Sequence, residues 1–121
     1  MIEGTLIAES LRVGTTLENL ELIIRKISRY RAQGSTPDQP DTWTTLDFET
    51  EAAGAEQLAE IFAGALDQPG WYANFQSPAE SFVIFPDRIF RYPRGDKAGR
   101  AEAQAYGRQL AIPEPQLDWT V

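Results

Sequence analysis

The chain has 121 residues, carries 11 basic and 18 acidic side chains for a formal charge of −7, and contains neither cysteine nor histidine. Disulfide frameworks, thiolate or imidazole metal sites, cysteine nucleophiles and Ser-His-Asp triads are therefore excluded. Because no apolar run is long enough to cross a bilayer and the first residues do not resemble a signal peptide, we expect one cytoplasmic domain spanning residues 1–121 and no membrane association.

The N-terminal quarter holds one short strand and one ambiguous segment. Thr5–Val13 alternates loosely and ends at a glycine, which predicts a first strand. Residues 17–31 fit a helix, with Thr15 and Glu18 as a capping box, because their leucines and isoleucines recur at helical spacing. They also fit a strand, because the run is rich in β-branched residues. We favour the strand.

The middle of the chain alternates between clear signals. Residues 33–42 are polar, contain two prolines and a glycine, and predict a loop. Trp43–Glu51 alternates strictly, so it is expected to be a half-buried strand with Leu46 and Phe48 facing the core. Residues 53–67 place their large apolar side chains on one stripe and predict a helix.

The C-terminal half is also divided by turn signals. Asp96 is a good N-cap for a second helix. The last segment, Gln116–Val121, is expected to form either a short strand or a docked tail. The predicted elements, in chain order, are a strand over 71–76, a hairpin of strands 82–85 and 89–92 around Pro86-Asp87-Arg88, and a helix over 97–110.

Together these elements predict an α+β fold. From residue 43 onward the order of strands and helices resembles a ferredoxin-like sandwich, which has one antiparallel sheet and two helices on one of its faces. The N-terminal strand or strands would extend or cover that sheet.

The charge is distributed unevenly along the chain. Residues 32–87 hold ten acidic side chains and no basic one, whereas both flanking segments are slightly basic. Either the blocks neutralise one another across the fold, or the folded protein has two electrostatic poles that can steer a basic partner.

Three carboxylates, Asp47, Glu49 and Glu51, would lie on one side of the predicted strand. Such a row could hold a hard cation or act as a general acid/base pair. No loop of the EF-hand kind accompanies it, and rows of charge are common on solvated strand faces. We therefore assign no catalytic residue, no metal site and no cofactor.

Aromatic residues are concentrated between positions 71 and 92, which hold 7 of the 13 in the chain. A strand has two faces, so one set should pack on the helices while the other is either covered or exposed as a binding or dimerisation surface. The candidate binding residues are Trp71, Phe75, Phe82, Phe90, Tyr92 and the neighbouring Arg91.

Nucleic acid is not an expected partner. The segment Ser81–Phe85 resembles the second aromatic strand of an RNA-recognition motif, but the Arg-Gly sequence that should precede it is missing. An isoelectric point of about 4.5 is also unsuited to neutralising phosphates.

A longer resemblance is evident in the C-terminal half, WYANFQSPAESFVIFPDRIFRYPRGDKAGRAEAQAYGRQLAIPEPQLDW, and would cover most of the chain. This segment resembles a family of small acidic bacterial proteins of unknown function. The resemblance implies no activity, cofactor or partner.

The main functional hypothesis is a non-enzymatic protein-interaction module that forms a homodimer or binds a partner protein through the aromatic sheet face. The alternative is a small-ligand-binding protein, or an enzyme that works without histidine and cysteine. Its site would be a cleft between the sheet and the 33–42 loop. The proposed lining residues are Tyr72, Tyr92, Arg91 and Asp47.

Overall fold

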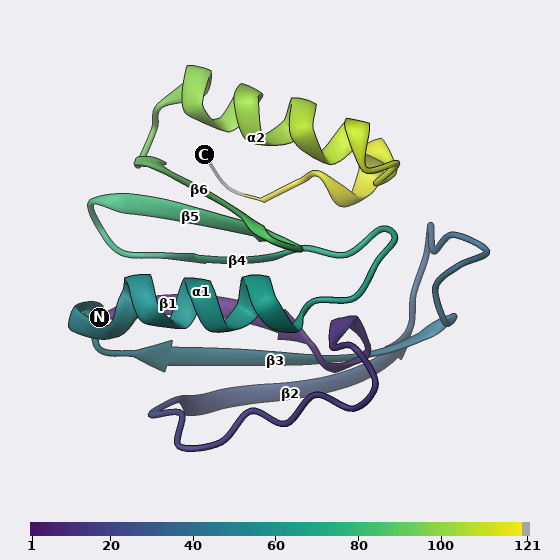
Figure 1. Ribbon diagram of the computed structural model, residues 1–121, viewed down its shortest axis with the longest axis horizontal. Helices are drawn as coiled ribbons and strands as arrows, with labels where there is room; N and C mark the ends of the chain where they lie inside the picture. The colour runs from purple at the N-terminus through teal and green to yellow at the C-terminus, as the bar shows by residue number, and fades with distance from the viewer. Residues whose placement is uncertain (120–121) are drawn as a thin grey trace.

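The computed structural model describes residues 1–119, which form an antiparallel sheet of six strands and two α-helices (Figure 1). The predicted α+β class is confirmed. No helix in the described part of the chain is long and apolar enough to span a membrane. The elements are β1 (Ile2–Ile7), β2 (Ile23–Arg31), β3 (Thr42–Thr50), α1 (Ala55–Ala65), β4 (Ala73–Gln76), β5 (Glu80–Phe85), β6 (Arg88–Pro93) and α2 (Lys97–Gln109), with short 3-10 turns at 8–10, 52–54 and 114–116.

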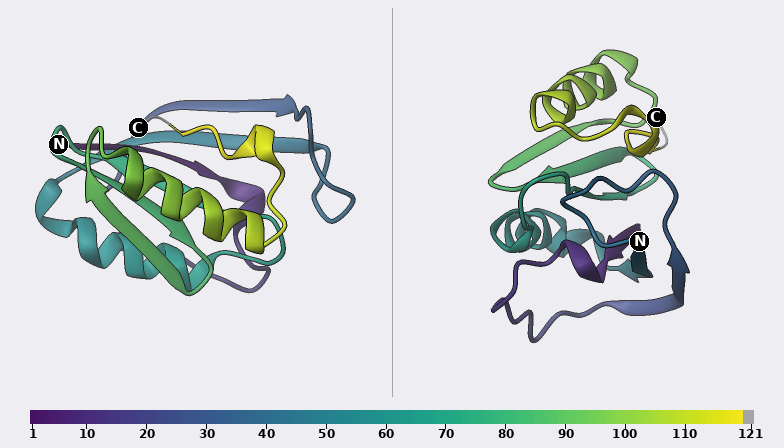
Figure 2. Two further views of the ribbon diagram at one scale, coloured as in Figure 1. Left: turned by 90° about the horizontal axis from the view of Figure 1, so that it is seen from above. Right: turned by 90° about the vertical axis from the view of Figure 1, so that its right-hand side faces the viewer.

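The order of strands in the sheet is β2-β3-β1-β4-β5-β6. The N-terminal strand β1 lies between β3 and β4 and pairs antiparallel with both. The chain therefore passes from β3 through α1 to β4 and leaves one strand between them. The ferredoxin-like arrangement is not confirmed, because no strand follows α2 within residues 1–119. Figure 2 shows α2 and β2 at opposite ends of the sheet.

The two helices cover opposite faces of the sheet, so the expectation that they share one face is wrong. Alternate side chains of β5 enter different cores, as strand geometry requires. Phe82 and Ile84 pack in a cluster with Phe62 of α1, whereas Val83 and Phe85 pack in a second cluster with Ala103 of α2. The hydrophobic run of β5 is therefore buried on both sides.

The ambiguous segment 17–31 is a strand only from Ile23 onward. Asn19 has a φ of 59°, and this left-handed conformation interrupts any regular helix or strand. The leucines of residues 17–22 pack partly against the α1 core from an irregular segment. The first strand also differs from its prediction, since it covers Ile2–Ile7 and a 3-10 turn follows it.

The C-terminal half follows its local signals closely. The Asp96 side chain caps α2 by accepting hydrogen bonds from the backbone N–H groups of Ala98 and Gly99, both at 3.1 Å. The hairpin turns at Pro86 and Asp87, as predicted. After α2 the chain docks as a tail, with Leu117 and Trp119 buried in the second core. The rest of the predicted last strand, residues 120–121, lies outside the described residues.

Candidate functional site

Four of the predicted binding residues are buried in the folded chain. Trp71, Phe75, Phe82 and Tyr92 are each at most 5% exposed. Phe75 and Phe82 belong to the α1 core, whereas Tyr92 and the half-buried Phe90 belong to the α2 core. These aromatic residues therefore pack on both sides of the sheet and do not form one surface patch, and binding through them stays a prediction.

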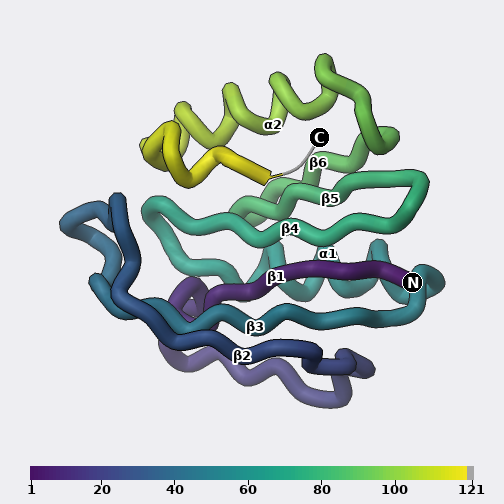
Figure 3. The backbone as a smooth tube through the Cα atoms, turned by 180° about the vertical axis from the view of Figure 1, so that it is seen from behind, coloured from purple at the N-terminus to yellow at the C-terminus, as the bar shows by residue number. Residues whose placement is uncertain are grey.

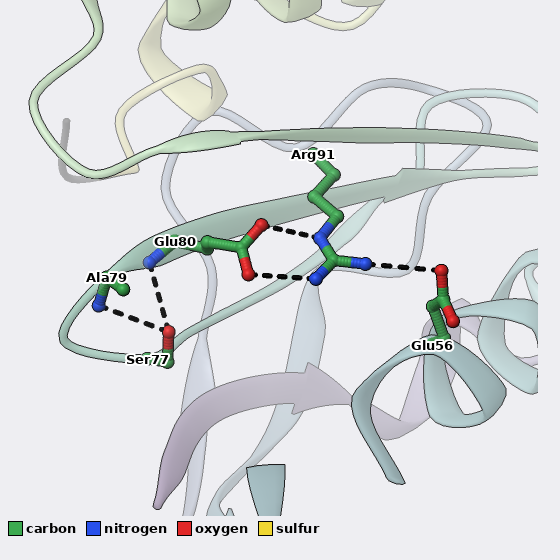
Figure 4. Close-up of polar contacts among 5 residues, drawn as sticks. All are labelled: Glu56, Ser77, Ala79, Glu80 and Arg91. Atoms are coloured by element: carbon green, nitrogen blue, oxygen red, sulfur yellow. Dashed lines mark hydrogen bonds and ion pairs between the residues drawn. The ribbon is translucent and has the colours of Figure 1, made fainter. Parts of the chain in front are cut away.

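Arg91 is the one predicted binding residue that is clearly exposed, and its charge is already paired (Figure 4). Its guanidinium donates to both carboxylate oxygens of Glu80, at 2.5 and 2.8 Å, and to Glu56 of α1 at 3.2 Å. The same guanidinium lies 4.9 Å from the ring centre of Phe82. Its hydrogen bonds hold the pKa of Glu80 below the usual range and raise the pKa of Arg91. Arg91 thus links β6 to α1 and covers the α1 core at Phe82.

Other ion pairs also join the basic ends of the chain to its acidic middle. Arg25 pairs with Glu49 at 2.9 Å and Arg31 with Asp41 at 3.5 Å. These contacts agree with the interpretation that the charge blocks partly neutralise one another. All of them lie at the surface, where a single pair contributes little to stability.

Exposed apolar side chains are concentrated on β2, at the edge of the sheet. Of the six large hydrophobic residues exposed in the described chain, four lie on this strand. Ile27 is 65% exposed and Tyr30 43%. The others on β2 are Ile23 and Ile24. An open strand edge with apolar side chains is a template for pairing with another chain.

Sequence reasoning placed the binding surface on the aromatic segment and missed this edge. A usable signal was present in the letters of β2, IIRKISRYR, which contain four basic side chains, four large apolar ones and no acid. Basic residues are typical of exposed edge strands. The order of strands nevertheless could not be predicted locally, so the edge could not be identified from that pattern alone.

No helix covers β1 and β3 on the face of the sheet opposite α1 (Figure 3). Side chains on this face line a groove. It consists of two adjoining cavities of about 370 and 410 Å³ that share Thr5, Asn74 and Asp118. The first cavity lies between the sheet, Gln33 of the predicted 33–42 loop, and the C-terminal tail. Its aromatic lining residues are Tyr30, Trp43, Trp71 and Tyr72.

Hydrogen bonds fix the loop and the tail on either side of this groove. The Gln116 side chain donates to the backbone carbonyl of Gly34 at 2.9 Å and to the side-chain oxygen Oε1 of Gln39 at 3.0 Å. The Gln39 amide in turn donates to the Gly70 carbonyl at 2.9 Å. These contacts join segments that are far apart in the sequence, so the groove exists only in the folded chain.

The groove includes two of the four lining residues predicted for a ligand cleft. Tyr72 lines the first cavity and Asp47 the second, whereas Tyr92 and Arg91 line neither. The Tyr72 hydroxyl donates to the backbone carbonyl of Gln116. Burial raises the pKa of Tyr72 well above its ordinary value, and the negative charge of Asp118 adds to the increase. The Tyr72 hydroxyl therefore keeps its proton, which it donates to the C-terminal tail, to a higher pH than an ordinary tyrosine.

The carboxylate row is only partly available for binding. Asp47 accepts a hydrogen bond from the Thr5 hydroxyl at 2.8 Å, and Glu49 pairs with Arg25. Within residues 1–119, no group of three or more acidic side chains is placed to hold a metal ion.

Comparison with known proteins adds no assignment to this geometry. No protein-family model matches the chain, and no curated protein or solved structure matches it either.

Proposed function

We propose that this protein is a non-enzymatic interaction module and that it binds another protein chain through the β2 edge. The observation that carries the proposal is the concentration of exposed isoleucines and Tyr30 on an edge strand of nine residues. Exposed apolar side chains contribute contact area, and an unpaired strand edge supplies backbone donors and acceptors for a further strand. The predicted aromatic binding surface is replaced by β2 in this proposal, because most of those aromatic residues are buried.

Site-specific photo-crosslinking in cells tests this function directly. A photoreactive phenylalanine replaces Ile27 on β2, and in the control protein it replaces Glu102, which is exposed on α2. We expect an adduct from position 27 whose attachment site maps to one defined chain, and no such adduct from position 102. Absence of an adduct at position 27, or the same adducts from both positions, would contradict an interaction at β2.

The groove supports a second candidate function, the binding of a small ligand. Its two adjoining cavities fall in the size range of small-molecule sites, and aromatic side chains, Tyr72 among them, line one of the two. A thermal-shift screen with metabolites tests this candidate, because a ligand that binds only the folded state raises the unfolding temperature. We expect Asn74→Ala, which alters both cavities, to abolish any shift. A screen without any shift at millimolar concentrations would argue against this function.

A further inference from the structure

The outer edge of β2 has no strand partner in the described chain. The sheet pairs β2 with β3 alone. Among residues 1–119, no backbone hydrogen bond outside the sheet and the helices involves any residue from Ile23 to Arg31. Another extended chain can therefore form a ladder of hydrogen bonds here without displacing one that exists.

The charge of this edge is opposite to that of the whole protein. The strand carries Arg25, Lys26, Arg29 and Arg31 and no acidic residue, although the chain as a whole has a formal charge of −7. Arg29 and Arg31 pair with Glu9 and Asp41 at 3.7 and 3.5 Å; the two arginine side chains remain 68% and 81% exposed, whereas Glu9 is 21% exposed. Pairs of this kind are weak, so they can give way to a partner's carboxylates.

Pairing between two copies of β2 is disfavoured by this charge. A two-fold axis perpendicular to the sheet must lie between the two strands at the level of one residue, which then faces its own copy, and residues equally distant from the axis face each other. In any register the pair brings together two strands that each carry four basic side chains and no acidic one, and an axis at Tyr30 sets Arg29 directly against Arg31 of the second copy. An axis at position 26, 29 or 31 sets a basic residue against its own copy. Like charges directly opposite each other destabilise a strand pair.

We propose that the partner of β2 is an extended acidic segment of a different protein, which adds to the sheet as a seventh strand. This inference rests on the proposed function and specifies the partner's chemistry. The pairing with β3 places Ile24 and Ile27 toward the α1 side, followed on the same side by Arg29 and Arg31. The segment should therefore carry apolar side chains opposite the isoleucines and carboxylates opposite the arginines.

Two synthetic peptides test the inference. The first is antiparallel to β2 by design, with glutamates facing its basic residues and valines facing its isoleucines; the second has lysines in place of the glutamates. We expect the acidic peptide to bind, measured by fluorescence anisotropy, and its affinity to fall as salt is added. The lysine peptide should bind at least about tenfold more weakly.

Charge reversal on the protein provides the matched test. The double variant Lys26→Glu, Arg29→Glu should bind the acidic peptide at least about tenfold more weakly than the wild type does. It should bind the lysine peptide instead. The control Lys97→Glu, at an exposed position on α2, should bind as the wild type does. Equal affinity for both peptides, binding of neither, or a concentration-dependent dimer crosslinked through position 27 would overturn the inference. An adduct from position 27 to a second copy would still support an interaction at β2, so the two proposals can fail separately.

Discussion

The two edges of the sheet differ in what lies beside them. β6 is six residues long, ends at Pro93, and packs against α2, with the Trp119 indole donating to the Tyr92 hydroxyl at 2.7 Å. β2 is nine residues long and has exposed isoleucines and bases with no helix beside it (Figure 1). Thus α2 and the tail that follows it cover one end of the sheet. At the other end, β2 exposes basic and apolar side chains. This difference underlies our proposal that β2 binds a partner, whereas α2 and its tail stabilise the fold.

The largest expected effect on stability comes from a substitution in the second core, at the covered end of the sheet. Phe85→Ala removes a ring that contacts Tyr72, Phe90 and Tyr106 in the second core, so the free energy of unfolding should fall by about 3–5 kcal/mol. At the open edge, Ile27→Thr should change it by less than about 0.5 kcal/mol. Urea denaturation of both variants measures the contrast. Similar losses from the two substitutions would contradict the assignment of different roles to the two edges.

A smaller effect sharpens the account of how α2 packs on β6. A Cβ at Gly99 would lie 2.6 Å from the Cβ of Tyr92, so Gly99→Ala forces the helix off the strand and should destabilise by about 1–3 kcal/mol. A Cβ at Gly64 in α1 would meet open space, so Gly64→Ala should be neutral or stabilise the fold by up to about 1 kcal/mol. Thermal unfolding of the pair checks this reversal of sign. A neutral Gly99→Ala would show that α2 is not closely packed on β6.

The stability of the fold should depend on pH in the alkaline range, because Tyr72 is partly buried beside the tail that covers the second core. The pKa of Tyr72 is raised in the folded state, so the unfolded chain releases this proton first as the pH rises. The stabilisation is therefore complete below the ordinary tyrosine pKa of about 10 and is lost above it. Denaturation at a series of alkaline pH values should show a steeper loss for the wild type than for Tyr72→Phe. Tyr30→Phe, on the open edge, is the control, and an unchanged slope in Tyr72→Phe would contradict the prediction.

The smallest effect is expected at the ion pairs of Arg91. Arg91→Gln removes the hydrogen bonds that hold the Glu80 pKa low, so that pKa should return toward its usual value, as measured by NMR titration. A carboxyl pKa that is lower in the folded state stabilises the fold at pH values above the pKa of the unfolded chain. This contribution disappears as the pH falls through the pKa of the folded state. The variant and the wild type should therefore converge in stability at acidic pH. A Glu80 titration that Arg91→Gln leaves unchanged would show that another group lowers its pKa.

Local signals were sufficient for most elements and insufficient for the candidate site. The alternation of Trp43–Glu51 correctly predicted a strand with Phe48 in the core, and Asp96 correctly predicted the start of α2. The aromatic density between 71 and 92 did not show which face each ring occupies. Burial of β5 on both faces depends on α1 and α2, which come from distant parts of the sequence. The interpretation of those rings as a surface therefore lacked the information that it needed.

The sequence by itself determined the α+β class, most turns, the Asp96 cap of α2, and the chemistries that a chain without cysteine or histidine cannot perform. Those properties depend on residues close together or on composition. Only the tertiary structure decided that β1 lies between β3 and β4, that the helices take opposite faces, and that β2 stays at the edge. Strand order depends on pairing between segments far apart in the chain, and the hydrophobic pattern of one strand does not specify its neighbour. The basic, isoleucine-rich β2 is therefore an ordinary segment in the sequence and becomes a candidate binding surface only in the folded sheet.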